Sequence, residues 1–162
     1  MEERKIETTY TVYAHVGELE QAEQTLMQKA AEARDKAYAP YSKFNVGAAI
    51  LLSSGAIVTG SNQENAAYPS GLCAERTAIY YAGANFPNDT IAKIAITVKS
   101  ETTAVNSPAS PCGACRQAIA EYEFKQKQPI EIIFMGETGE VYKVNSLTTL
   151  LPFTFNSSYL KK

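Results

Sequence analysis

Hydrophobic positions along the chain follow two spacings, one typical of helices and one typical of strands. Apolar side chains recur every three or four positions among strong helix formers, which predicts a helix over residues 18–38. Residues 73–82 and 112–124 contain few helix-breaking residues and predict two more helices, which end near Gly83 and before Pro129.

Short runs of β-forming residues predict five strands. They are residues 45–52, 56–60, 91–98, 130–135 and 140–144. Ser-Ser-Gly separates the first two runs and Gly-Glu-Thr-Gly separates the last two, so we expect a hairpin at each position. Ser146 is expected to cap a short helix that reaches Leu151. Helices that alternate with these strands predict an α/β layer sandwich with a mixed sheet.

The N-terminal region has a weaker pattern. β-forming residues alternate over residues 6–16, which is compatible with a strand or with a loosely attached arm. A chain of 162 residues fits one domain, and no stretch resembles an interdomain linker. We therefore expect an N-terminal extension over residues 1–20 and a single domain over residues 21–162.

Composition and charge narrow the function. A content of 45% hydrophobic and 20% charged residues is that of a globular protein. The net charge of -2 offers no basic surface for nucleic acid, and no apolar run approaches the roughly 18 residues that a membrane span needs. The first 16 residues lack the apolar region of a secretory signal. We expect a soluble, cytoplasmic protein that binds neither nucleic acid nor membrane.

The three cysteines lie in two short clusters, each at the start of a predicted helix. Cys112 and Cys115 are three positions apart, so both thiolates can face one ion, and Cys73 can supply a third from another helix. Structural zinc sites usually have four protein ligands, whereas catalytic sites have three and keep one position for water or substrate. The cysteine count therefore favours one catalytic zinc ion per chain.

Two charged residues follow Cys73 directly. Glu75 is too close to Cys73 in a helix to share its ion comfortably, but it can reach a water on the metal and act as proton shuttle, which is the chemistry of hydrolytic deamination. Three thiolates give Zn²⁺ a net charge of -1 and weaken it as a Lewis acid. Arg76 is the nearby cation that could tune this charge by donating to a sulfur.

Less specific explanations exist for each of these residues. A Cys-x-x-Cys pair is often structural or redox-active, but a structural site needs a fourth ligand, for which only His15 is available, and a redox pair leaves Glu75 unexplained. Glu75 could simply favour the helix dipole, and Arg76 could be a surface cation. The combination of three cysteines with Glu75 favours the catalytic interpretation.

Several motifs together resemble those of the homotetrameric, zinc-dependent cytidine deaminases. The zinc deaminase signature is a Cys or His, one spacer and Glu, followed by Pro-Cys-x-x-Cys. The matching segments are Tyr-Ala-Pro-Tyr-Ser-Lys-Phe (38–44), Asn-Gln-Glu-Asn-Ala-Ala-Tyr (62–68), Cys-Ala-Glu-Arg-Thr-Ala (73–78), Ser-Pro-Cys-Gly-Ala-Cys-Arg-Gln (110–117) and Leu-Leu-Pro (150–152). The resemblance covers roughly residues 20–160 and is specific.

This resemblance implies a three-layer sandwich with a mixed five-stranded sheet flanked by helices, and a homotetramer with sites shared between subunits. It also implies that the cysteines hold zinc and that Glu75 is the general acid and base. The expected substrate-binding residues are Phe44, Asn62, Glu64, Tyr68, Ala74 and Phe155, the last reaching a neighbouring subunit's site. Without the resemblance, Phe44 and Phe155 would be taken for core residues, and Asn62 and Glu64 for solvated loop residues.

The expected reaction converts cytidine and 2′-deoxycytidine to uridine and 2′-deoxyuridine plus ammonia, in pyrimidine salvage. Gln63 stands where this family usually has an apolar residue, and Phe153 is bulky in a tail that is often small, so details of the ribose pocket and subunit contacts are open. The alternatives are a deaminase for another aminopyrimidine or a polynucleotide, and a non-catalytic zinc or redox module. Glu64 and the acidic balance disfavour phosphate-bearing substrates.

Overall fold

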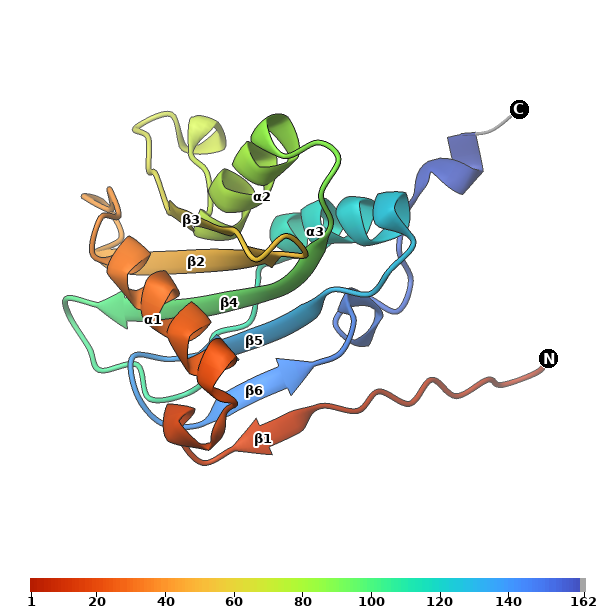
Figure 1. The fold of residues 1–162 in the computed structure, drawn as a ribbon, viewed down its shortest axis with the longest axis horizontal. Helices are drawn as coiled ribbons and strands as arrows, with labels where there is room; N and C mark the ends of the chain where they lie inside the picture. Colours follow the sequence, from red (N-terminus) through yellow and green to blue (C-terminus); the bar gives the residue numbers. More distant parts are fainter. Residues whose placement is uncertain (161–162) are drawn as a thin grey trace.

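The computed structural model describes residues 1–160, which form three α-helices and one six-stranded sheet (Figure 1). The helices are α1 (Gln21–Arg34), α2 (Ala74–Asn85) and α3 (Gly113–Gln126). The strands are β1 (Thr11–Tyr13), β2 (Phe44–Leu52), β3 (Ile57–Ser61), β4 (Ile91–Ser100), β5 (Glu131–Met135) and β6 (Val141–Val144). Four short 3-10 helices complete the list: η1 (Val16–Glu18), η2 (Tyr68–Ser70), η3 (Leu147–Thr149) and η4 (Ser157–Leu160). The predicted α/β class and the two hairpins are confirmed.

The strands are ordered β1-β6-β5-β4-β2-β3, and only the β4–β5 pair among them is parallel, so the predicted mixed sheet is confirmed. The predicted number of five strands is wrong. β1 adds a sixth because Thr11 pairs with Lys143 and Tyr13 with Val141 on the edge of β6. Residues 1–10 are exposed and lack regular structure, so the N-terminal region combines a short strand with an arm.

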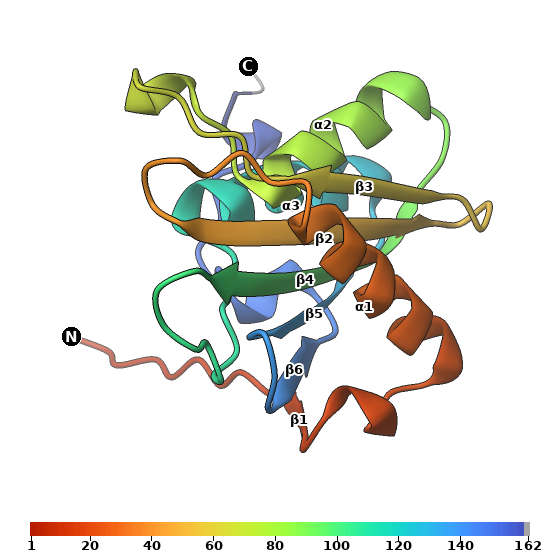
Figure 2. The same cartoon turned by 90° about the vertical axis from the view of Figure 1, so that its left-hand side faces the viewer.

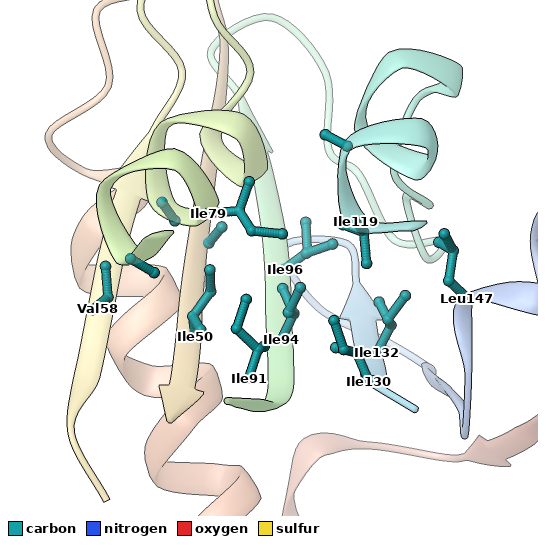
Figure 3. Close-up of a cluster of buried hydrophobic side chains, with 14 of the residues drawn as sticks. Ile50, Val58, Ile79, Ile91, Ile94, Ile96, Ile119, Ile130, Ile132 and Leu147 are labelled. Carbon is teal, nitrogen blue, oxygen red and sulfur yellow. The ribbon is translucent and has the colours of Figure 1, made fainter. Parts of the chain in front are cut away.

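Helices cover both faces of the sheet, which gives three layers (Figures 1 and 2). On one face, Leu26 and Ala30 of α1 pack with apolar residues of β2, β4 and β5. On the other face, Ile79 of α2 and Ile119 of α3 join a larger cluster with isoleucines of the central strands (Figure 3). The alternation of apolar residues along β4 and β5 therefore supplies both cores.

Two glycines permit close contacts between elements. A Cβ atom on Gly47 of β2 would lie 1.9 Å from the Ala30 carbonyl oxygen, so α1 rests directly on the sheet at that position. A Cβ atom on Gly83 would lie 2.2 Å from the hydroxyl oxygen of Tyr122 on α3. Gly83 therefore makes room between helices, and the prediction that it ends α2 is wrong, since the helix continues to Asn85.

The first helix is shorter than predicted. α1 begins at Gln21, after η1 and an extended Leu19, and ends at Arg34. Tyr38 cannot stay helical because its N–H donates to the Asn62 carbonyl and its own carbonyl accepts from Glu64. The chain therefore leaves α1 early and pairs with the segment that follows β3. Ser146 caps η3 through a hydrogen bond from Thr148 N, as predicted.

Within residues 1–160, none of the helices is both long enough and apolar enough to cross a bilayer.

Candidate active site

The three cysteines meet at the first turns of α2 and α3. Cys73 is the N-cap of α2 and Cys112 the N-cap of α3, and neither uses its side chain to cap the helix. The Cys73 and Cys112 sulfurs are 3.7 Å apart, and those of Cys112 and Cys115 are 3.4 Å apart. All three sulfurs lie within 4.8 Å of one another. The positive ends of both helix dipoles thus point toward one group of thiols.

This group fits a zinc ion. Zinc–sulfur bonds of about 2.3 Å in a tetrahedral site place neighbouring sulfurs about 3.8 Å apart, close to the separations between these thiols. Three sulfur donors leave one tetrahedral position for water or substrate, as in catalytic sites. Within residues 1–160, the group of possible ligands consists of these three cysteines. His15 is not part of it and lies in the turn after β1, where its Nδ1 accepts from Gly17 N at 3.1 Å.

Hydrogen bonds among the thiols favour a thiolate at Cys73. The Cys115 thiol, with help from Arg76 and Cys112, lowers the pKa of Cys73 to about 5. The shared hydrogen bond with Cys73 and burial raise the pKa of Cys115. Arg76 Nη2 lies 3.8 Å from the Cys73 sulfur, so the guanidinium donates to one of the proposed zinc ligands. The thiolate form of Cys73 is therefore stabilised by the Cys115 thiol and by Arg76.

Glu75 is buried beside these cysteines, with 5% of its surface exposed, and it lines the same cleft as Cys73 and Cys112. Burial raises the pKa of the Glu75 carboxyl, and the nearby Cys73 charge acts in the same direction. A carboxyl group with a raised pKa can hold and release protons closer to neutral pH, as general acid–base chemistry requires. The first turn of α2 thus brings a buried carboxyl group with a raised pKa next to the three thiols.

A cleft of about 740 Å³ opens in front of the cysteines. Its apolar wall is formed by Val46 near the start of β2 and by Ile96 and Val98 near the end of β4. The predicted residues Phe44, Asn62, Glu64 and Tyr68 also line it, together with Cys73, Glu75, Arg76 and Cys112. A cavity of this size with an apolar wall and a few polar groups suits a nucleoside-sized ligand.

Asn62 has structural partners in addition to its place on the cleft. Its Oδ1 accepts from Val46 N at 2.8 Å, and its Nδ2 donates to the Phe44 carbonyl at 2.9 Å. The side chain is 9% exposed. The amide therefore fixes the start of β2, where the predicted stacking residue Phe44 lies.

Glu64 organises the opposite rim of the cleft. Its Oε2 accepts from the N–H groups of Tyr41 and Ser42 at 2.9 and 3.2 Å. A hydrogen bond from the Ser42 side chain and these N–H groups hold the pKa of the Glu64 carboxyl below its usual value. Tyr68 lies beside Tyr41, with ring centroids 6.0 Å apart, and is largely exposed. Glu64 is thus an anion at neutral pH at the mouth of the cleft.

Two predicted residues do not line this cleft. Ala74 is fully buried in the first turn of α2. Phe155 lies in the C-terminal tail, where its ring stacks on Tyr159 at a centroid distance of 5.7 Å. The structure therefore does not bring Phe155 into the cleft of its own chain.

Sequence reasoning assigned no role to several other residues of the cleft, among them Tyr41, Ser42, Gln63, Asn65, Leu72 and Ser110. Most of them lie within or next to the motif segments. Their nearness in sequence to Asn62, Glu64 and Cys112 could therefore have indicated that they line the cleft. The apolar wall residues Val46, Ile96 and Val98 have the pattern of ordinary strand residues, so the sequence did not distinguish them as part of a cleft.

Comparisons with known proteins agree with this geometry. Residues 20–128 match the family model described as the cytidine and deoxycytidylate deaminase zinc-binding region. The chain is 46% identical over 135 residues to a cytidine deaminase of Halalkalibacterium halodurans, which covers 83% of this chain and 94% of the relative.

Solved structures show the same relationship. The cytidine deaminase of Burkholderia pseudomallei superposes with a TM-score of 0.69 at 39% identity, covering 81% of this chain and 97% of the other. The cytidine deaminase of Mycobacterium tuberculosis superposes with a TM-score of 0.62 at 31% identity, covering 81% and 94%.

Proposed function

Since the chain belongs to the zinc-binding cytidine and deoxycytidylate deaminase family, we propose that it hydrolyses cytidine and 2′-deoxycytidine to uridine and 2′-deoxyuridine with release of ammonia. The observation that carries this proposal is the group of three cysteine sulfurs with the buried Glu75 at the end of a nucleoside-sized cleft. Pyrimidine salvage in the cytoplasm is the corresponding biological role.

Cys73, Cys112 and Cys115 would hold the zinc ion. When bound, zinc activates water as a nucleophile by lowering its pKa to about 7. Arg76 offsets part of the thiolate charge through its contact with the Cys73 sulfur. The metal ligands and their neutralising cation thus come from the first turns of two helices.

Glu75 would move both protons of the reaction. It takes one proton from the attacking water and delivers it to N3 of the base, while the water oxygen bonds to C4. It then takes the second proton of that oxygen and gives it to the amino group as the C4–N bond breaks. The products are uridine, which keeps the proton on N3, and ammonia. Only 5% of the surface of Glu75 is exposed, which limits its contact with bulk water.

The remaining cleft residues would hold the nucleoside. Phe44 would stack on the pyrimidine, and Tyr68 would cover the open side of the cleft. Asn62 and Glu64 would contact the ribose hydroxyls. Because Glu64 is an anion, a 5′-phosphate near it would be repelled, which favours nucleosides over nucleotides.

The first test is loss of the cytosine absorbance when cytidine is added to the zinc-loaded protein. Glu75→Gln is expected to lower kcat by about 10²–10⁴-fold or more while zinc content stays unchanged. Arg76→Gln is expected to lower kcat less, again with zinc retained. Glu101→Gln, which removes an exposed carboxylate from the loop before α3, should match the wild type. A zinc-loaded wild type without turnover would exclude cytidine as substrate, and other aminopyrimidine nucleosides would be tried next.

We also propose a homotetramer in which Phe155 completes a neighbouring subunit's site. Support comes from the position of Phe155 outside its own cleft and from the exposure of Phe153, Phe155 and Tyr159 in the tail. Such a cluster of exposed aromatic residues is typical of an interface.

Mixed subunits can test this arrangement. Glu75→Gln and Phe155→Ala chains are each expected to be weakly active alone. Mixed and reassembled, they should exceed the sum of their separate activities, because one chain supplies Phe155 and the other supplies Glu75. Light scattering gives the subunit number in parallel, and a monomer, or a mixture without gain, would contradict the shared site.

A further inference from the structure

Arg116 connects three separate parts of the chain around the proposed zinc site. Its Nε donates to the Pro111 carbonyl at 2.9 Å, and its Nη2 donates to Ser110 Oγ at 3.0 Å. Its Nη1 donates to the Leu150 carbonyl at 2.9 Å, from a position 34 residues earlier in the chain. The planar, multi-donor guanidinium is suited to such a three-way contact, which a lysine ammonium on its flexible stem cannot reproduce.

The first two contacts stabilise the approach to Cys112. Residues 101–111 contain no helix or strand, so the path of the chain into α3 depends on side-chain contacts. Arg116 also forms the first helical hydrogen bond of this turn, from its N–H to the Cys112 carbonyl at 2.9 Å. Arg116 directly follows Cys115, and its hydrogen bonds reach Ser110, Pro111 and Cys112. One residue therefore contacts the chain on both sides of the Cys112–Cys115 pair.

The third contact joins Arg116 to the C-terminal tail. Leu150 follows η3, and the next residue of α3, Gln117, donates its Nε2 to the Phe155 carbonyl at 2.8 Å. Two neighbouring side chains of α3 therefore hold both ends of the 150–155 segment, which carries Phe153 and Phe155. Arg116 therefore contacts both the turn that carries Cys112 and Cys115 and the C-terminal tail.

We propose that Arg116 is a positioning residue that couples zinc retention to docking of the C-terminal tail. It holds Ser110 and Pro111 so that Cys112 faces the other two sulfurs, and it holds Leu150 so that the tail stays on α3. Loss of this side chain should loosen both regions together. The proposal rests on the proposed zinc deaminase site, but its tests need no substrate.

The first measurement is the rate at which zinc leaves the holoprotein for a coloured chelator. Arg116→Gln and Arg116→Lys are both expected to release zinc about 10-fold faster or more, since outer contacts of metal ligands typically change affinity by about 10–100-fold. Ser110→Ala removes one of the three contacts and should give a smaller change in the same direction. This milder variant keeps the test usable if the Arg116 variants fold poorly.

The second measurement is hydrogen exchange in residues 147–156 of the zinc-loaded proteins. Both Arg116 variants should exchange faster there than the wild type, and Gln117→Ala should exchange faster without a comparable gain in zinc release. Lys125→Gln, which removes a cation from the last turn of the same helix, is the matched control and should change neither quantity.

Three results would overturn the proposal. They are zinc release at the wild-type rate in both Arg116 variants, full rescue by Arg116→Lys, which would mean that only charge matters, and an unchanged tail despite faster zinc release. If the wild type retains zinc but fails to deaminate cytidine, the proposed function fails while these measurements still decide the role of Arg116.

Discussion

At the scale of single residues, two polar side chains that line the cleft also form hydrogen bonds with its backbone. The Asn62 amide uses an acceptor and a donor on two residues of β2, and Glu64 accepts from two N–H groups of the facing loop. Each contact replaces a hydrogen bond that the backbone group would otherwise lose in a partly buried place. The predicted ribose contacts therefore depend on residues whose orientation is fixed before substrate arrives.

Asn62→Asp tests this dual role. The aspartate can still accept from Val46 N, but its second oxygen would face the Phe44 carbonyl, which loses its donor. We expect a loss of about 1–3 kcal/mol in the free energy of unfolding, or about 2–10 °C in Tm, and a higher KM for cytidine because Phe44 shifts. Calorimetry and steady-state kinetics measure both. Asn88→Asp, at an exposed position, is the control, and equal Tm values for the two variants would contradict the prediction.

At the scale of elements, a buried charge cluster attaches α1 to the sheet. Glu23 of α1 is 1% exposed, and its Oε1 accepts from Lys93 of β4 and Lys143 of β6, each at 2.6 Å. Both lysines also pair with Glu131 of β5, at 3.0 and 2.8 Å. One helix and three strands thus meet in a cluster of two acids and two bases on the face opposite the cleft.

Removing the buried carboxylate should be costly. Glu23→Gln leaves two partly buried lysines with one acid, and breaking a buried ion pair typically costs about 3–5 kcal/mol in the free energy of unfolding. Denaturant titration measures this loss. Glu32→Gln, in an exposed pair with Lys29 on the same helix, should cost less than about 1 kcal/mol. Similar losses in both variants would rule out a special role for the cluster.

The same cluster predicts a dependence on acid. Burial opposes ionisation of Glu23, but hydrogen bonds from Lys143 and Lys93 outweigh it and hold the pKa of Glu23 below its usual value. A lowered folded-state pKa contributes stability that is complete above the unfolded pKa of about 4.3 and is lost as pH falls through the folded value. The wild type should therefore lose stability more steeply than Glu23→Gln below about pH 4.

At the scale of the whole molecule, the N-terminal segment divides into a free part and a packed part. Residues 1–9 are exposed, whereas the Tyr10 ring packs on Tyr142, with ring centroids 5.0 Å apart. β1 pairs with β6, and Leu19 is buried against α1 and the sheet. The expected domain boundary at residue 20 thus falls after residues that contribute to the core.

Two truncations separate these parts. Removal of residues 1–9 should leave Tm unchanged, because these residues are exposed and precede the Tyr10–Tyr142 contact. Removal of residues 1–20 should lower Tm by about 5–10 °C, since it exposes the edge of β6 and removes Leu19 from the core. Thermal unfolding of both proteins against the full chain measures the difference. Equal Tm values for the two truncations would mean that β1 and Leu19 add nothing to stability.

Local signals allowed most of the fold to be predicted, and long-range pairing accounts for what was missed. The three helices and five strands have strong periodicity. The Cys-x-x-Cys spacing with Cys73-Ala74-Glu75 predicted a set of metal ligands, and the structure brings the three cysteines together. The pairing of β1 with β6 and the early end of α1 depend on partners more than 20 residues away, which periodicity does not report. Arg116 was missed for the same reason, since its partner Leu150 is distant in sequence.

The direction of β1 has a practical consequence for handling the protein. β1 runs antiparallel to β6, so residues 1–10 leave the sheet at the end where β4 begins, whereas the cleft lies near Val98, where β4 ends (Figure 1). A purification tag or carrier fused ahead of Met1 would therefore emerge at the opposite end of the sheet from the three cysteines and Glu75 of the same chain. Attachment of the protein to a solid support through this end would leave the cleft open to dissolved nucleosides.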